Sequence, residues 1–133
     1  MAKRISEILI VEMTKKLITI QESRVLILGI TYKGDCPDIR NTKVVDLIEI
    51  LRSSGIRVDV YDPCASPEHV KAEFNISLVS EPKNEYYDAI VCAVAHSEFN
   101  KLTKEELVAM GRSNCIIYDL KRTLREGIAT FDL

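Results

Sequence analysis

Two uninterrupted apolar runs constrain the fold of this chain more than any other feature. The runs, "RVLILGI" at residues 24–30 and "DAIVCAVA" at residues 88–95, are apolar throughout after one leading charged residue. Strands of this kind are buried on both faces, as in parallel sheets that helices cover on both sides. Helical patterns separate the candidate strands, and right-handed crossovers join parallel strands. The sequence therefore predicts an α/β fold in which these two strands lie side by side at the centre.

Three further segments are expected to extend this sheet. Residues 56–61 alternate between apolar and charged side chains, which indicates a strand with one wetter face near an edge. Short apolar runs at residues 76–80 and 114–119 complete the set. We expect 56–61 and 76–80 on one side of the central pair and 114–119 on the other. The result is a doubly wound, Rossmann-like parallel sheet of five strands in the order 3-2-1-4-5.

One helix precedes the sheet. Residues 4–20 are predicted to be helical, since six apolar residues recur near helical spacing: Ile5, Ile8, Leu9, Met13, Leu17 and Ile20. Further apolar residues lie on other sides of this helix, so it needs more than one neighbour. We expect its apolar surface to pair with a second copy, with Ile5, Ile8, Leu9, Met13 and Leu17 in the contact.

Composition excludes several classes of protein. The chain has 133 residues, enough for one domain with a sizeable core, and a formal net charge of −2. This charge does not favour binding to nucleic acid or to an anionic membrane surface. No apolar stretch reaches the roughly 18 residues of a membrane span. Glu7 and Glu12 interrupt the apolar N-terminal run, which argues against a signal peptide, so a cytoplasmic location is expected.

The four cysteines predict neither a disulfide framework nor a metal site. They form no C-x-x-C pair, and only two histidines could complete a zinc site. Cys92 and Cys115 lie in apolar runs and are expected to be small buried hydrophobes. Cys36 lies in a polar loop and could be a nucleophile, although no histidine neighbours it in sequence.

The connector "GITYKGDCPDIRNTK", residues 29–43, carries more charge than a strand-to-helix turn requires. It follows the first strand, where the strand order reverses, and ligands of open α/β sheets bind at this point. The loops after the first, fourth and fifth strands should bring four basic side chains round one crevice: Lys33, Arg40, His96 and Lys121. A helix predicted over 42–54, capped by Asn41 or Thr42, adds free N–H groups. The expected ligand is an anion, most plausibly a phosphate group.

Two simpler interpretations stay open at this point. Lys33 and Arg40 could merely pair with Asp35 and Asp38 in a solvated loop, and His96 could be a cap or a satisfied polar group. The connector also matches neither common phosphate motif. Asp35-Cys36 stands where a P-loop requires Lys-Ser/Thr, and G-x-G-x-x-G is absent.

Ordered blocks over residues 22–124 resemble the C-terminal domain of the UDP-glucose/GDP-mannose dehydrogenase family. The blocks are a strand ending in Gly29, the pair Tyr32-Lys33, the triplet 38–40 (Asp-Ile-Arg) and the strand end 61–63 (Tyr-Asp-Pro). Later blocks are "AIVCAVAHSEF" and "IIYDLK". The stretches "CPDIRNTKV" and "AVAHSEF" are most similar to the branch that acts on UDP-N-acetylhexosamines.

The resemblance implies an NAD-dependent oxidoreductase of polysaccharide biosynthesis. The family oxidises the C6 alcohol of the sugar to a carboxylate with two NAD⁺, through a cysteine-bound thiohemiacetal and thioester. Residues 1–21 would be the end of the central helical, dimerising region, and residues 22–133 the UDP-sugar-binding domain. A glycine-rich NAD motif and the family's catalytic cysteine block are absent, so this part alone is expected to be inactive. Its partners would be the N-terminal and central domains of the same homodimeric enzyme.

The resemblance also implies roles for individual residues. Tyr32 and Lys33 match an aromatic-lysine pair that contacts the UDP-sugar, and Arg40 matches an arginine that reaches NAD across the interdomain cleft. Lys121 falls where the UDP-glucose branch often has a substrate-contacting arginine, and whether Lys121 or Arg122 makes this contact stays open. The alternative is a stand-alone nucleotide-binding protein or a flavodoxin-like signalling module without catalysis.

Overall fold

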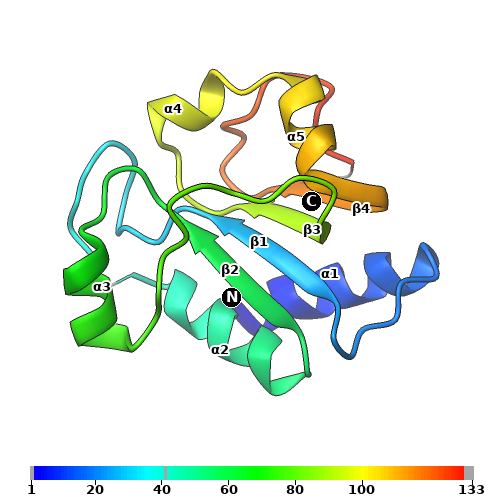
Figure 1. Cartoon of the computed structure of the whole chain (residues 1–133), viewed down its shortest axis with the longest axis horizontal. Coiled ribbons are helices and arrows are strands. Elements are labelled where there is room, and N and C mark those ends of the chain that lie inside the picture. The colour runs from blue at the N-terminus through cyan, green and yellow to red at the C-terminus, as the bar shows by residue number, and fades with distance from the viewer. Residues whose placement is uncertain (1, 41, 131–133) are drawn as a thin grey trace.

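The computed structural model describes residues 2–40 and 42–130, which form one sheet with helices packed against it (Figure 1). The strands are β1 (Arg24–Leu28), β2 (Arg57–Tyr61), β3 (Tyr87–Cys92) and β4 (Gly111–Asp119). The helices are α1 (Ala2–Lys15), α2 (Val44–Ser53), α3 (Pro67–Phe74), α4 (Ser97–Asn100) and α5 (Lys104–Met110). None of the described helices is long and apolar enough to cross a membrane.

The four strands form one parallel sheet in the order β2-β1-β3-β4. Helices cover both faces: α1 and α2 lie on one side, and α4 and α5 on the other (Figure 1). Alternate residues of β1 therefore enter two different cores. Val25 and Ile27 pack with residues of α1 and α2, whereas Leu26 and Leu28 pack with Leu107 of α5 and its neighbours. This arrangement explains the uninterrupted apolar run and confirms an α/β fold with a parallel sheet.

The expected fifth strand is not confirmed. Residues 76–80 contribute a single bridge, Leu78 opposite Val60, in which the Val79 N–H donates to the Val60 carbonyl at 2.9 Å. This segment has only one neighbouring strand, and Pro82 has no N–H with which to continue the ladder. The sheet of the described residues therefore has four strands, and residues 76–80 run beside β2 as a nearly irregular edge.

Helix α1 is shorter than the sequence predicts and is not left without partners. It ends at Lys15, since Leu17 adopts a positive φ of 63° and the Ile18 N–H returns to the Met13 carbonyl. Leu9 and Met13 are fully buried against α2 and the sheet. Leu9 and Met13 therefore cannot contribute to the expected two-fold contact, because one copy of the chain already buries them. Ile5 and Ile8 are half-buried and Leu17 is exposed, so a contact through these three residues stays a prediction.

The helix ends agree with the sequence in part. The N-cap residue of α2 is Lys43, one residue after the expected cap Thr42, and its side chain makes no cap hydrogen bond. The Val44 N–H still donates to Thr42 Oγ1 at 3.3 Å, and the alternative cap, Asn41, lies outside the described residues. The capping box of Thr103 and Glu106 at the start of α5 is confirmed.

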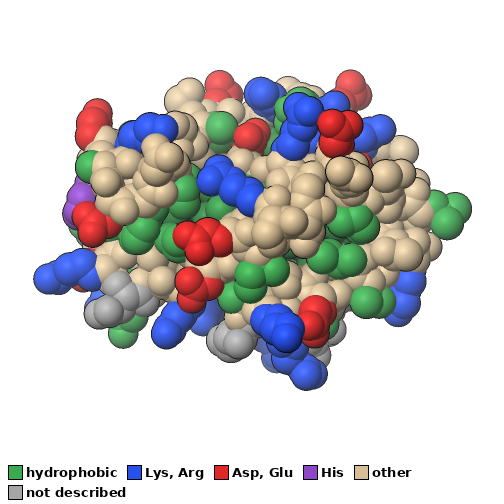
Figure 2. All heavy atoms as spheres, turned by 90° about the horizontal axis from the view of Figure 1, so that it is seen from below, with side chains coloured by type: hydrophobic (Ala, Val, Ile, Leu, Met, Phe, Trp, Pro, Cys, Tyr) green, Lys and Arg blue, Asp and Glu red, His purple; other side chains and the backbone are tan. Residues whose placement is uncertain are grey.

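Figure 2 shows the molecule from the side of α2, where charged side chains of both signs surround hydrophobic side chains that reach the surface.

The packing of α1 makes a prediction about stability. Leu9→Ala should lower the free energy of unfolding by about 2–5 kcal/mol, because it leaves a cavity between α1 and the sheet. Leu17→Ala is the matched control: its side chain is 91% exposed, and the change should stay within about 0.5 kcal/mol. Denaturant unfolding of both variants measures the difference. Equal effects would show that α1 does not pack on its own sheet.

Candidate functional site

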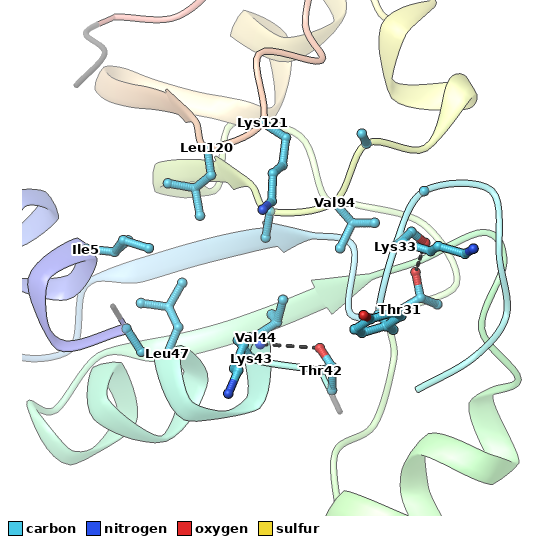
Figure 3. A pocket seen from close by; sticks show the side chains of 15 residues that line it. Ile5, Thr31, Lys33, Thr42, Lys43, Val44, Leu47, Val94, Leu120 and Lys121 are labelled. Carbon is cyan, nitrogen blue, oxygen red and sulfur yellow. Dashed lines mark hydrogen bonds between the residues drawn. The ribbon is translucent and has the colours of Figure 1, made fainter. Parts of the chain in front are cut away.

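A pocket of about 420 Å³ lies at the carboxyl ends of the central strands (Figure 3). The connector contributes residues 31–34, the start of α2 contributes 42–44 and Leu47, and the ends of β3 and β4 contribute 93–95 and 120–121. Ala2 and Ile5 of α1 complete the lining. Five segments that are distant in sequence thus meet at the point where the strand order reverses.

The pocket combines an apolar wall with positive charge. Its larger aliphatic side chains come from four segments of the chain: Ile5, Val44, Leu47, Val94 and Leu120. Its charged side chains are Lys33, Lys43 and Lys121, and no carboxylate is among the described residues of the lining. In Figure 3 the Lys121 side chain extends toward the middle of the pocket, while the Lys33 amine points outward over the connector. The pocket is therefore locally cationic in a chain of net charge −2.

The structure brings together some of the residues singled out in the sequence and not others. Tyr32, Lys33 and Lys121 all line the pocket, and the Tyr32 ring is 57% exposed. Arg40 and His96 are not part of the lining, so the expected grouping of four basic side chains is wrong in these two members. Arg40 and His96 lie outside the pocket lining for different reasons.

Arg40 is engaged by its neighbour Asp38. Its Nε and Nη2 atoms donate to the two carboxylate oxygens at 3.0 Å each, and the Arg40 side chain is 83% exposed. The hydrogen bonds and charge of Arg40 lower the pKa of Asp38 to about 2. The pairing within a solvated loop is thus observed for Arg40. It is not observed for Lys33, because the carboxylate of Asp35 accepts hydrogen bonds from Ser97 instead.

His96 is fully buried behind the pocket. Its Nδ1 accepts a hydrogen bond from the Asp35 N–H at 2.9 Å, so the ring proton resides on Nε2. Nε2 lies 2.9 Å from Asp62 Oδ2 and 3.2 Å from Thr31 Oγ1. His96 is therefore a satisfied buried group, the simpler of the two interpretations that the sequence left open.

Sequence reasoning missed Asp62 as the partner of this histidine. Asp62 follows β2 and is 7% exposed. Its Oδ2 accepts from the N–H groups of Ile30 and Thr31 at 2.7 and 3.3 Å, and its Oδ1 from those of Cys64 and Ala65 at 2.7 and 3.0 Å. The signal in the sequence was the Tyr-Asp-Pro strand end, which places a carboxylate beside the end of β1.

Two glycines allow the connector to approach the segment after β3. A Cβ atom on Gly34 would collide with the Ala95 carbonyl group, and one on Gly29 would collide with the Val94 side chain. Gly29 also adopts a φ of 99°, which favours glycine. Close contact between the connector and the segment after β3 therefore sets how deeply Tyr32 and Lys33 lie in the pocket.

Asp35, Cys64 and His96 place potential metal ligands within 4.8 Å of one another, a proximity that the sequence did not predict. The hydrogen bonds of these three residues argue against a metal site. Nδ1 of His96 already accepts from the Asp35 N–H, and both oxygens of Asp35 accept from Ser97. Burial and nearby carboxylates raise the pKa of the Cys64 thiol, which disfavours the thiolate that binds metal. The cluster is a hydrogen-bonded contact between loops.

The expected burial of two further cysteines is confirmed for Cys92 and only in part for Cys115. Cys92 is fully buried in β3, and burial raises the pKa of its thiol to about 12. Burial likewise raises the pKa of the half-buried Cys115 to about 12. Neither thiol is therefore activated as a nucleophile.

Comparisons with known proteins agree with this geometry. The chain is 43% identical over 124 residues to a UDP-N-acetyl-D-glucosamine 6-dehydrogenase of Salmonella typhi, covering 93% of the chain and 29% of that protein. It is also 43% identical over 118 residues to a Pseudomonas aeruginosa protein of the same name, covering 89% of the chain and 28% of the relative. The chain thus spans less than a third of the length of these relatives.

A solved structure and a family profile complete the comparison. The UDP-D-ManNAc dehydrogenase from Pyrococcus horikoshii superposes with a TM-score of 0.78 at 26% identity, covering 98% of this chain and 29% of that one. Residues 26–126 match the profile described as "UDP-glucose/GDP-mannose dehydrogenase family, UDP binding domain". The chain therefore belongs to the UDP-glucose/GDP-mannose dehydrogenase family, with residues 26–126 as its UDP-binding domain.

Proposed function

We propose that this chain is the UDP-sugar-binding part of an NAD-dependent 6-dehydrogenase that oxidises a UDP-N-acetylhexosamine to its uronic acid. The observation that carries the proposal is the cationic pocket at the strand-order reversal, lined by Lys33 and Lys121 without a carboxylate among the described lining residues. The 43% identity to two UDP-N-acetyl-D-glucosamine 6-dehydrogenases supports this substrate class.

In this proposal residues 22–133 form the binding domain and residues 1–21 the end of the central helical region. The NAD-binding domain and the catalytic cysteine belong to the rest of the enzyme, which also forms the homodimer. The proposal includes a cytoplasmic location, where both a nucleotide sugar and NAD are available. This chain alone then binds the nucleotide sugar without turning it over. A flavodoxin-like signalling module gains no support, because the relatives described above are dehydrogenases.

The pocket residues divide the recognition of a UDP-sugar between them. Lys33 and Lys121 supply point charges for the diphosphate. Both side chains are exposed in this chain, and their charges would interact more strongly with the ligand in a cleft that the rest of the enzyme closes against water. The exposed Tyr32 ring offers a flat apolar surface at the same edge. Binding of the nucleotide end orients the sugar, so these residues would act on the rate through positioning while other domains perform the oxidation.

Removal of Lys33 tests the phosphate contact. In the complete dehydrogenase, Lys33→Ala should lower kcat/KM for the UDP-sugar by about 1.5–3 kcal/mol in transition-state terms, because a charged hydrogen bond is lost. The matched control is Lys104→Ala on α5, an exposed lysine outside the pocket. Steady-state kinetics of both variants give the comparison. An unchanged kcat/KM in Lys33→Ala would overturn the assignment.

Substitution of Lys121 and of Arg122, the two neighbouring cations after β4, tests which of them makes the second contact to the UDP-sugar. Lys121 lines the pocket and Arg122 does not, so Lys121→Ala should weaken UDP-sugar use by about 1.5–3 kcal/mol while Arg122→Ala leaves it nearly unchanged. The same kinetic assay decides between them. The opposite ranking would assign the contact to Arg122.

Arg40 is proposed to serve the cofactor, in keeping with its place outside the sugar pocket. Its bond to Asp38 is exposed, so the guanidinium can exchange this carboxylate for an anionic group of NAD. Arg40→Ala should therefore raise the KM for NAD⁺ more than the KM for the UDP-sugar. Initial rates with each substrate varied in turn measure the ratio, and the reverse order would contradict the role.

A further inference from the structure

We propose that the buried pair His96–Asp62 is a positioning device that fixes the segment 30–35 on both sides of Lys33. The inference rests on the proposed function of Lys33 as a nucleotide-sugar contact. His96 does not line the pocket, and its ring is fully buried. Its effect on binding would therefore pass entirely through the connector.

The first half of the device holds the residues before Lys33. Asp62 Oδ2 accepts from the N–H groups of Ile30 and Thr31, and the Nε2–H of His96 points at the same oxygen from 2.9 Å. The Thr31 hydroxyl donates to the Lys33 carbonyl at 2.9 Å. Because its proton is used there, Oγ1 of Thr31 is left as an acceptor toward His96 Nε2 at 3.2 Å.

The second half holds the residue after Gly34. The Asp35 N–H donates to His96 Nδ1 at 2.9 Å, and the Asp35 carboxylate accepts from the Ser97 N–H at 2.8 Å and from its hydroxyl. Opposite nitrogens of one imidazole thus contact the two ends of the five-residue span 31–35. An apolar side chain could fill the same space, but it could not supply a donor to one end and an acceptor to the other.

The two halves differ in how much they depend on the ring. Without His96, Asp62 would keep four backbone donors, from Ile30, Thr31, Cys64 and Ala65. The Asp35 N–H has His96 Nδ1 as its acceptor in the described structure. The acceptor function of the ring is therefore the one whose loss should free the connector.

A pair of substitutions separates the two functions of the ring. In His96→Asn the amide oxygen lies near the place of Nδ1 and can accept from the Asp35 N–H. In His96→Gln the amide reaches the place of Nε2 and can contact Asp62, but nothing replaces Nδ1. His69→Gln is the matched control, because His69 is exposed on α3.

The experiment is an NMR titration of the full 133-residue chain with UDP, together with hydrogen exchange of the Asp35 amide. We expect His96→Gln to weaken UDP binding by about tenfold and to accelerate exchange at Asp35 by at least about tenfold, the value of one buried hydrogen bond. His96→Asn should restore both measurements to within about threefold of the unsubstituted chain, and His69→Gln should change neither.

The outcomes distinguish this inference from the proposed function. A chain that does not bind UDP overturns both. A chain that binds UDP and loses affinity in Lys33→Ala, but keeps it with slow Asp35 exchange in His96→Gln, overturns the positioning role alone. If neither His96 variant folds, Thr31→Val removes the hydroxyl bond to the Lys33 carbonyl at nearly constant shape. It should weaken UDP binding about threefold, and unchanged affinity would overturn the inference.

Discussion

The carboxylate of Asp62 is the interaction on which the binding edge of this domain depends. It accepts hydrogen bonds from the segment after β1, from the turn after β2 and from His96 beyond β3. Three strand ends are therefore joined by one buried anion. A buried charge is tolerated when its oxygens are satisfied, and here backbone N–H groups do most of this work. The consequence is that the three strand ends are joined without a lysine, so Lys33 and Lys121 stay available for a ligand.

The distribution of charge fits the proposed ligand better than the total charge does. The chain is slightly acidic, yet the pocket at the strand-order reversal presents lysines and apolar groups without a carboxylate among the described lining residues. The carboxylates of the connector are engaged elsewhere, Asp38 with Arg40 and Asp35 with Ser97. These acidic residues hold the loop in shape and stay off the binding surface. The net charge of the chain therefore does not argue against a local anion site.

Much of the fold could be predicted because burial leaves a direct record in the sequence. The apolar run of β1 reports helices on both faces, and the position of Lys33 and Lys121 at a common edge follows from strand order alone. The fate of His96 and Arg40 could not be predicted in this way, since it depends on side-chain partners. Asp62 lies near His96 only in the folded chain, and Asp38 meets Arg40 through a local turn. Likewise, the apolar residues of α1 report burial without saying whether the neighbour is the same chain or another.

The packing of α1 has a consequence for how the limits of this domain are understood. Residues 26–126 match the family profile. Leu9 and Met13 precede this range in sequence but cover one face of the sheet, and Ile5 forms part of the pocket wall. The core of the domain therefore extends beyond the residues that the family profile covers. Helix α1 therefore belongs both to the core and to the wall of the pocket, so a change in its packing would alter the shape of the pocket as well as the stability of the domain.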